Sequence, residues 1–153
     1  MALAVGIGYD SHRFGAGRRL VLGGIEVPHD LGLEGHSDAD VLTHAVIDAI
    51  LGAAGGGDIG TMFPDDDERW QGADSIDLLR TAVGTISGRI ENVDATIVCE
   101  QPRIGPHREE MERTIADATS ARVSVKATSN EGMGFVGRGE GIACIAVASV
   151  ESE

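Results

Sequence analysis

Aromatic side chains are scarce in this sequence, since Phe, Trp and Tyr together make up 3% of its 153 residues. The hydrophobic core therefore has to be built mainly from Val, Ile, Leu and Ala. Cysteine is almost as rare: Cys99 and Cys144 are the two present, and they form no CxxC pair. Their spacing indicates no disulfide framework, and their apolar, strand-like surroundings predict two ordinary core residues.

Basic residues are also few, because 12 Lys and Arg stand against 25 Asp and Glu, which gives a formal net charge of −13. Such an acidic chain is poorly suited to nonspecific binding of nucleic acid or of an anionic membrane. An anionic substrate would need metal ions or local cations to attract it against this field. The sequence shows no recognisable signal or transit peptide and no membrane-spanning run, so we expect a cytoplasmic protein.

Hydrophobic patterning predicts one domain over residues 1–153, in which strands and helices alternate. The predicted strands cover residues 3–9, 19–22, 25–27, 92–100, 122–128 and 141–150, and Gly23-Gly24 is typical of a hairpin turn. The predicted helices cover about 38–52 and 75–87, and a third begins near Pro106. Because several connections are too short for a crossover helix, we expect an α+β fold with a mixed β-sheet covered by helices on one face.

The most informative pattern is a candidate metal site made of Asp10, His12 and His44. Asp10-x-His12 ends the first predicted strand, and residues two apart on a strand point to the same face. His44 lies near the start of the predicted helix 38–52, for which Ser37 is a good N-cap. Two imidazoles and a carboxylate suit zinc or a similar cation, and three protein ligands leave a fourth position open, as in catalytic sites. The alternative is a polar strand end and a histidine on a helix surface.

Further polar residues precede His44 directly, and their density favours the metal site. They are His36, Ser37, Asp38 and Asp40. Asp38 and Asp40 are also typical of capping at a helix N-terminus. A capping role is compatible with orienting a metal-bound histidine through a hydrogen bond.

The glycine-rich residues 54–60 could let the backbone approach a ligand and present N–H groups to it. They are followed by Phe63-Pro64-Asp65-Asp66-Asp67. No Gly-Lys-Ser/Thr follows, so this is not a Walker loop, and a helix C-cap with a mobile loop explains the glycines equally well. The acidic triplet could face solvent, bind a cation or accept hydrogen bonds from a sugar.

A third candidate segment runs from Lys126 to Glu131 and enters the glycine-rich residues 132–141. Lysine, hydroxyl groups and backbone N–H groups are good phosphate contacts, and Glu131 could hold a hard cation such as magnesium. The alternative is structural, with Arg138 and Glu140 forming only an ion pair in a turn.

An activated nucleophile is not recognisable in the sequence, which has no Gly-x-Ser-x-Gly elbow and no reactive-looking cysteine beside a histidine. A metal site and phosphate-binding loops without a nucleophile predict phosphoryl chemistry in which the substrate supplies its own attacking group.

Four segments, residues 8–14, 36–44, 58–65 and 134–141, match one known family in order and spacing over nearly the whole chain. They resemble the 2-C-methyl-D-erythritol 2,4-cyclodiphosphate synthases of the non-mevalonate isoprenoid pathway. The resemblance implies that 4-diphosphocytidyl-2-C-methyl-D-erythritol 2-phosphate closes to the 2,4-cyclodiphosphate and releases CMP. An oxygen of the 2-phosphate attacks the β-phosphorus, and it needs no general base because it is already anionic.

The resemblance also implies roles for individual residues. Asp10, His12 and His44 would hold zinc, Glu131 would contact a second divalent ion, magnesium or manganese, and His36 and Ser129 would stabilise the transition state. The residues expected to contact substrate are Asp10, His12, His36, Ser37, Asp58, Ile59, Gly60, Phe63, Pro64, Asp65, Asp66, Asp67, Cys99, Glu100, Gln101, Pro102, Arg103, Ile104, Gly105, Lys126, Thr128, Ser129, Asn130, Glu131, Phe135 and Arg138.

One segment departs from the family, which commonly has Thr-Thr-Thr-Glu where this chain has Thr128-Ser129-Asn130-Glu131. Ser129 keeps the hydroxyl, so we expect the reaction to survive. Family members resemble one another in forming homotrimers, with sheets packed around a threefold axis and active sites between subunits; residues 141–150 could face that axis. Two other functions are compatible with the motifs: a zinc-dependent phosphoesterase in which water attacks, and a non-catalytic trimeric module that binds metal or an isoprenoid.

Overall fold

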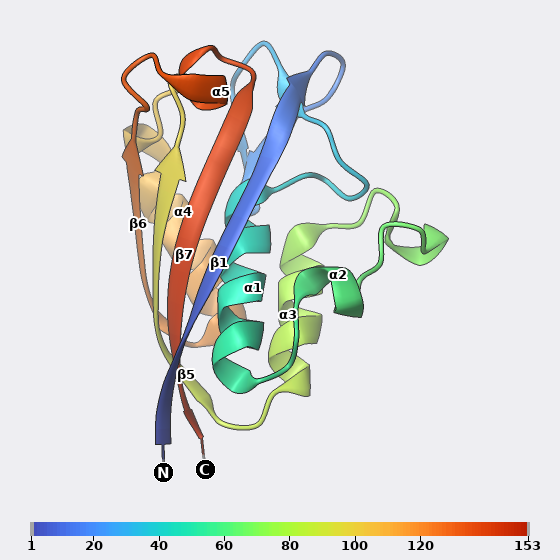
Figure 1. Cartoon of the computed structure of the whole chain (residues 1–153), viewed down its shortest axis with the longest axis vertical. Helices are drawn as coiled ribbons and strands as arrows, with labels where there is room; N and C mark the ends of the chain where they lie inside the picture. The colour runs from blue at the N-terminus through green and yellow to red at the C-terminus, as the bar shows by residue number, and fades with distance from the viewer. Residues whose placement is uncertain (1, 153) are drawn as a thin grey trace.

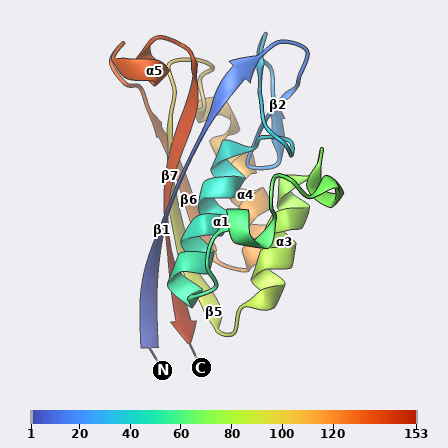
Figure 2. The ribbon, with the colours of Figure 1, turned by 45° about the vertical axis from the view of Figure 1, so that its right-hand side comes forward.

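The computed structural model describes residues 2–152, so Met1 and Glu153, the two ends of the predicted domain, lie outside the described part. The main sheet has five strands in the order β4–β1–β7–β5–β6, and its longest helices pack on one face (Figures 1 and 2). The strands are β1 (Ala2–Gly15), β4 (Gly32–Leu33), β5 (Arg89–Val98), β6 (Arg122–Thr128) and β7 (Gly141–Ser152). β5 and β6 pair in parallel and the other neighbours are antiparallel, which confirms the predicted mixed sheet.

Three helices of 11 to 14 residues lie on this face: α1 (Val41–Ala54), α3 (Ser75–Thr85) and α4 (Arg108–Thr119). α1 and α4 pack on the strands, and α3 packs on α1 and α4. Two helices of one turn, α2 (Ile59–Met62) and α5 (Gly134–Gly137), lie in the connections, together with 3₁₀ turns at Glu68–Trp70 and Gly105–His107. Within residues 2–152, no helix combines the length and the apolar character needed to cross a membrane.

The hairpin predicted at Gly23-Gly24 is confirmed. β2 (Leu20–Leu22) and β3 (Ile25–Val27) pair antiparallel, and Leu22 lies opposite Ile25, so the two glycines form the turn. Both glycines have positive φ, a conformation that side chains with a Cβ rarely adopt.

Close packing of α1 on β1 positions the candidate site. A Cβ added to Gly6 would lie 2.1 Å from the carbonyl oxygen of Ala49, and one added to Gly8 would lie 1.9 Å from that of Ala45. The helix backbone can therefore approach the strand only because these two positions are glycine. His44, which precedes Ala45, is held over the strand residues that follow Gly8.

Two predicted boundaries near the site are wrong. β1 continues to Gly15, so Asp10 and His12 lie inside the strand, where pairing with β7 extends to Arg13. α1 begins after Asp40, not after Ser37: the Asp40 side chain accepts the Thr43 N–H, and Ala39 has φ 58°, which a helix does not allow.

The remaining elements differ less from expectation. The predicted strand 122–128 is correct, and 92–100 is shifted to Arg89–Val98. The third helix follows a 3₁₀ turn and begins at Arg108. β4, α2 and α5 were not predicted, because two to four residues are too short to show a hydrophobic period.

Candidate functional site

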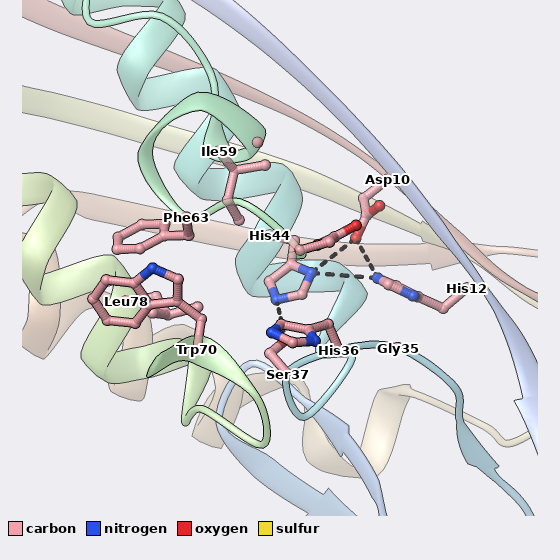
Figure 3. Close-up of a pocket in the computed structure, with 12 residues that line it drawn as sticks. Asp10, His12, Gly35, His36, Ser37, His44, Ile59, Phe63, Trp70 and Leu78 are labelled. Carbon is pink, nitrogen blue, oxygen red and sulfur yellow. Dashed lines mark hydrogen bonds and ion pairs between the residues drawn. The ribbon is translucent and has the colours of Figure 1, made fainter. Parts of the chain in front are cut away.

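Asp10, His12 and His44 converge on the side of β1 that faces α1 (Figure 3). Asp10 and His12 alternate with the exposed Tyr9 and Ser11, whose side chains belong to the opposite face of the strand. His44 lies in the first turn of α1 and is buried. Within residues 2–152, these three form the one group of His, Cys, Asp and Glu side chains close enough to share a metal ion.

The spacing of the three ligand atoms fits a small cation. Asp10 Oδ2 lies 2.8 Å from His12 Nε2 and 3.1 Å from His44 Nδ1, and the two nitrogens are 3.3 Å apart. Tetrahedral zinc with bonds of about 2.0–2.1 Å needs neighbouring ligands roughly 3.3 Å apart. The donor set of two imidazoles and a carboxylate is also one that zinc accepts, so the residues present fit such an ion.

The surroundings of His12 direct a free ring nitrogen toward the cluster. Its Nδ1 lies 2.9 Å from the Glu34 carbonyl oxygen, which can only accept, so Nδ1 carries a proton. In the neutral ring Nε2 is then unprotonated and faces Asp10. This carbonyl contact is a common way to orient a metal-binding histidine.

The charges of Asp10 and His12 stabilise each other. Burial alone would raise the pKa of Asp10, but its interactions with the imidazoles of His12 and His44 outweigh burial and hold that pKa below its ordinary 3.8. Burial likewise opposes the charged form of His12, but the bond to Asp10 raises the pKa of His12 above its ordinary 6.5. The metal-free cluster therefore favours a positive charge at the place a metal ion would occupy.

A hollow of about 370 Å³ opens beside the cluster (Figure 3). Its polar wall carries the three candidate ligands with His36 and Ser37, and its apolar wall comes from α2, α3 and the loop between them. The apolar residues are Ile59, Phe63, Trp70 and Leu78, and Gly35, Gly60 and Asp65 complete the lining. A hollow with one charged and one apolar wall suits a ligand that has a phosphorylated end and a carbon skeleton.

His36 and Ser37 lie in a loop that hydrogen bonds hold in place. His36 Nε2 donates to the Asp67 carbonyl oxygen at 3.0 Å, and Ser37 Oγ lies 3.0 Å from His44 Nε2. The Arg18 guanidinium donates to the carbonyl oxygens of Gly35 at 2.8 Å and Ser37 at 2.7 Å. The loop therefore has fixed contacts on both sides of His36.

The acidic residues that follow α1 differ in their contacts. Asp58 is the N-cap of α2, and its hydrogen bonds from Thr61 lower its pKa. Asp67 caps the 3₁₀ turn and pairs with Arg69, which lowers the pKa of Asp67. Asp65 lines the hollow, whereas the exposed Asp66 and the half-buried Pro64 do not.

A second group of predicted residues lines a different hollow, of about 340 Å³, where β5 and β6 end. It contains Cys99, Glu100, Pro102, Arg103, Ile104, Gly105, Thr128 and Ser129. Ser129 Oγ accepts the Glu131 N–H at 3.2 Å, and Asn130 Nδ2 donates to the Met133 carbonyl at 2.8 Å, so the turn after β6 is ordered by its own side chains. The Glu131 side chain is exposed.

The last four predicted contacts lie elsewhere. Gln101 and Arg138 line a third hollow, and Phe135 lines a fourth. Arg138 pairs with Glu140 at 2.7 Å, as the structural alternative predicted. Lys126 lies on the uncovered face of the sheet, 2.5 Å from Asp94, and its phosphate contact stays a prediction.

Within one chain, the metal cluster and the second hollow are separated across the width of the sheet, from β1 to β6. Asp10 pairs with Cys144, Cys144 with Ile97, and Ile97 with Ala127, so Asp10 and Ala127 are level across the strands. Three strand spacings of about 4.8 Å separate them by roughly 14 Å. Ser129 and Glu131 follow Ala127 by only a few residues, and they do not line the hollow of the metal cluster.

Both cysteines are buried and free. Burial, helped by the Glu100 carboxylate, raises the pKa of the Cys99 thiol to about 11, and burial also raises the pKa of Cys144. Neither thiol is therefore a ready nucleophile, in agreement with the sequence.

The sequence did not reveal several neighbours of the site. Trp70 and Leu78 reach the hollow from the 3₁₀ turn and from α3, and the Phe63 and Trp70 rings meet edge to face at 5.0 Å. Ser75 contacts His44 from the start of α3. Nothing in their local sequence marks them, because tertiary packing alone brings them to the site.

Comparisons with known proteins agree with this geometry. The family model of the YgbB family matches residues 3–151. A 2-C-methyl-D-erythritol 2,4-cyclodiphosphate synthase from Symbiobacterium thermophilum is 55% identical over 154 residues, a match that spans 97% of this chain and 98% of that enzyme.

Two solved structures have the same fold. The bifunctional IspDF from Campylobacter jejuni superposes with a TM-score of 0.94 at 38% identity over 99% of this chain, which spans 43% of that longer protein. IspF from Plasmodium falciparum, solved as a CDP complex, superposes with a TM-score of 0.85 at 30% identity and covers 99% of this chain and 97% of its own.

Proposed function

The chain belongs to the YgbB family, and on that basis we propose that it closes 4-diphosphocytidyl-2-C-methyl-D-erythritol 2-phosphate to 2-C-methyl-D-erythritol 2,4-cyclodiphosphate and releases CMP. A new bond forms between an oxygen of the 2-phosphate and the β-phosphorus. The bond from the β-phosphorus to the oxygen it shares with the α-phosphorus breaks, and CMP leaves with that oxygen. The reaction belongs to isoprenoid biosynthesis and needs no water.

The observation that carries the proposal is the three-ligand cluster of Asp10, His12 and His44 in the wall of a hollow of about 370 Å³. Attack of one phosphate on another brings like charges together, and two unit charges about 4 Å apart repel by roughly 4 kcal/mol at an effective dielectric near 20. Zinc, or a similar divalent ion, supplies positive charge against the diphosphate when it is bound there.

The protein residues around the cluster bind and orient the two reacting groups. The hydrogen bond that His36 Nε2 donates to the Asp67 carbonyl oxygen fixes the His36 ring in the wall of the hollow, beside the reacting phosphates. Ser37 contacts phosphate from the same loop, and Phe63 and Leu78 hold the carbon skeleton against the apolar wall. Holding both phosphates in one hollow fixes the two reacting groups of a single substrate molecule in a productive orientation.

The second hollow takes the cytidine and the remaining phosphate contacts. Residues Cys99 to Gly105, all of which except Gln101 line this hollow, bind the nucleotide. Ser129 donates its hydroxyl to the transition state, and Glu131 contacts a second divalent ion, magnesium or manganese. The CDP complex of the Plasmodium falciparum IspF supports a nucleotide subsite in this fold. The exposed Glu131 carboxylate is accessible to an ion that arrives with the substrate.

A homotrimer with active sites between subunits completes the proposal. The uncovered face of the sheet exposes a row of apolar side chains on β1 and β7: Leu3, Val5, Ile7, Tyr9, Ile145 and Val147, of which Ile7 is 71% exposed. Such a patch favours burial against other copies of the chain. Within a single chain, Asp10 of the metal cluster and Ala127 of the second hollow are roughly 14 Å apart. A neighbouring chain in the trimer could place its own second hollow closer to that metal cluster.

The cytoplasmic location and the single domain over residues 1–153 stay predictions from the sequence. So does the functional equivalence of Ser129-Asn130 to the threonines that are common in the family.

Phosphorus NMR of the purified protein with the proposed substrate, zinc and magnesium tests the function. We expect a cyclic diphosphate signal together with CMP, and we expect both to vanish in His44→Ala because a metal ligand is lost. His107→Ala is the matched control, since the His107 side chain lines neither hollow, and it should behave as wild type.

Other outcomes separate the alternatives. Free inorganic phosphate in place of the cyclic product would identify a phosphoesterase. No turnover with both metals present would favour a binding module, and unchanged cyclisation in His44→Ala would contradict the role of the cluster.

A further inference from the structure

The side of the His44 ring that faces away from Asp10 and His12 contacts a partly buried chain of hydrogen bonds that ends at Asp38. His44 Nε2 lies 2.8 Å from Ser75 Oγ, and Ser75 Oγ is hydrogen bonded in turn to Asp38 Oδ1. The Ser75 N–H donates to the other Asp38 oxygen at 2.9 Å. Ser75 is fully buried and His44 is nearly so, whereas Asp38 is half-buried, so the contact between the Ser75 hydroxyl and the His44 ring is shielded from solvent.

The direction of each hydrogen bond follows from the chemistry of the groups. The Asp38 carboxylate can only accept, so the Ser75 hydroxyl donates to it. The Ser75 oxygen then accepts from His44, which places the imidazole proton on Nε2. In the neutral ring, Nδ1 of His44 is then left with a free lone pair, and this atom lies 3.1 Å from Asp10 Oδ2, inside the cluster that would hold a cation.

We propose that Ser75 and Asp38 are positioning residues that hold His44 in its Nε2–H tautomer and thereby raise the affinity of the cluster for a divalent cation. The relay joins three parts of the chain: the first residue of α3, the segment before α1, and the first turn of α1. Hydrogen-bonded partners of this kind typically change metal affinity by 10–100-fold when they are removed.

Ser37 also lies near His44 Nε2, but its role differs. Its Oγ is farther away, at 3.0 Å, and it already accepts the Ala39 N–H. Ser37 lines the substrate hollow, whereas Ser75 does not. Ser75 therefore orients His44 through the ring nitrogen that faces away from the cluster, and the Ser37 hydroxyl remains available to a bound phosphate.

Zinc titration of the metal-free protein against a chromophoric chelator tests the relay, which rests on the cation site proposed above. We expect Ser75→Ala to weaken zinc binding by about 10–100-fold. Ser75→Thr keeps the hydroxyl and should recover most of the affinity. Asp38→Asn removes one of the two acceptor oxygens and should give an intermediate loss.

Asp74→Ala is the matched control for damage to α3. Asp74 is the N-cap of that helix and accepts the Ile76 and Asp77 N–H groups without contact to His44. We expect this variant to melt at a lower temperature than wild type but to bind zinc with wild-type affinity. Equal loss of affinity in Asp74→Ala and Ser75→Ala would overturn the relay, because helix stability would then explain both.

Nitrogen-15 NMR of the histidine-labelled, metal-free protein reads the tautomer directly. In wild type we expect the proton of the neutral His44 ring on Nε2. In Ser75→Ala we expect the Nε2–H and Nδ1–H tautomers to exchange. If wild type binds zinc and Ser75→Ala binds it equally well with an unchanged tautomer, the relay is wrong. If wild type itself binds no zinc, the cation site fails, which is a separate result.

Discussion

At the scale of single residues, Asp10 links the parts of the candidate centre. Its Oδ2 is within 3.1 Å of a nitrogen from each histidine, one on its own strand and one on α1. The same contacts that lower the pKa of Asp10 raise the pKa of His12. A metal ion therefore competes with a proton at this place.

The Asp10–His12 pair makes the stability of the metal-free protein depend on pH. The contribution of His12 is complete below its ordinary pKa of 6.5 and is lost as the pH rises through its raised pKa. That of Asp10 is complete above 3.8 and is lost as the pH falls through its lowered pKa. Urea unfolding in EDTA should show a larger cost of His12→Gln near about pH 5.5 than near about pH 8.5. An equal cost at both would contradict the pairing.

Ser129 is expected to act on turnover and not on metal binding. Loss of one transition-state donor typically lowers kcat by roughly 10²–10³-fold, so we expect a loss of that order in Ser129→Ala. Its bound zinc, measured by atomic absorption, should equal that of wild type because Ser129 does not belong to the cluster. Parallel loss of zinc and turnover would mean that its role is misassigned.

The sequence predicts the three candidate ligands because their geometry is local. Asp10 and His12 share a face by strand alternation, and His44 lies in a helix with a clear apolar stripe. Ser75 and Trp70 could not be predicted, since each comes to the site through the packing of α3 and its preceding turn on α1. Their own neighbours in sequence indicate only a helix start and a loop.

At the scale of elements, the contact between β1 and α1 sets the distance from Asp10 to His44. In Gly8→Ala the new Cβ would lie 1.9 Å from the Ala45 carbonyl oxygen, so the helix has to move. We expect a loss of about 1–3 kcal/mol of unfolding free energy, as for other overpacked sites, together with weaker zinc binding.

Gly84→Ala is the control for this change. Gly84 lies in α3 with nothing within 4 Å of an added Cβ, and alanine there should stabilise the helix by about 0.5–1 kcal/mol. Urea denaturation and chelator competition measure the two effects. Wild-type zinc affinity in Gly8→Ala would contradict the claim that this packing positions His44.

The start of α1 shows why an element boundary can escape sequence analysis. Ser37, Asp38 and Asp40 are all good N-caps, and their local sequence does not rank them. Asp40 is selected because its carboxylate also accepts the N–H groups of Gly23 and Gly24, from a hairpin turn 17 and 16 residues earlier in the chain. The mixed sheet and its helical cover were predictable, because long periodic segments define them.

At the scale of the whole molecule, the predicted site residues fall into two groups. The metal cluster faces the helices near β1, and the second hollow lies at the ends of β5 and β6. The uncovered sheet face between them carries the apolar row on β1 and β7. Association through that face would bury the row and offer each metal cluster a second hollow from another chain.

Complementation between two inactive variants tests this central claim most directly. His44→Ala and Ser129→Ala chains are co-expressed, and cyclic diphosphate formation is followed by phosphorus NMR. Each variant alone should be nearly inactive, whereas random mixed trimers in equal proportion should recover about a quarter of wild-type activity, since a site between an intact metal cluster and an intact Ser129 forms with that frequency. Mixed trimers with no more activity than the separate variants would contradict a site shared between chains.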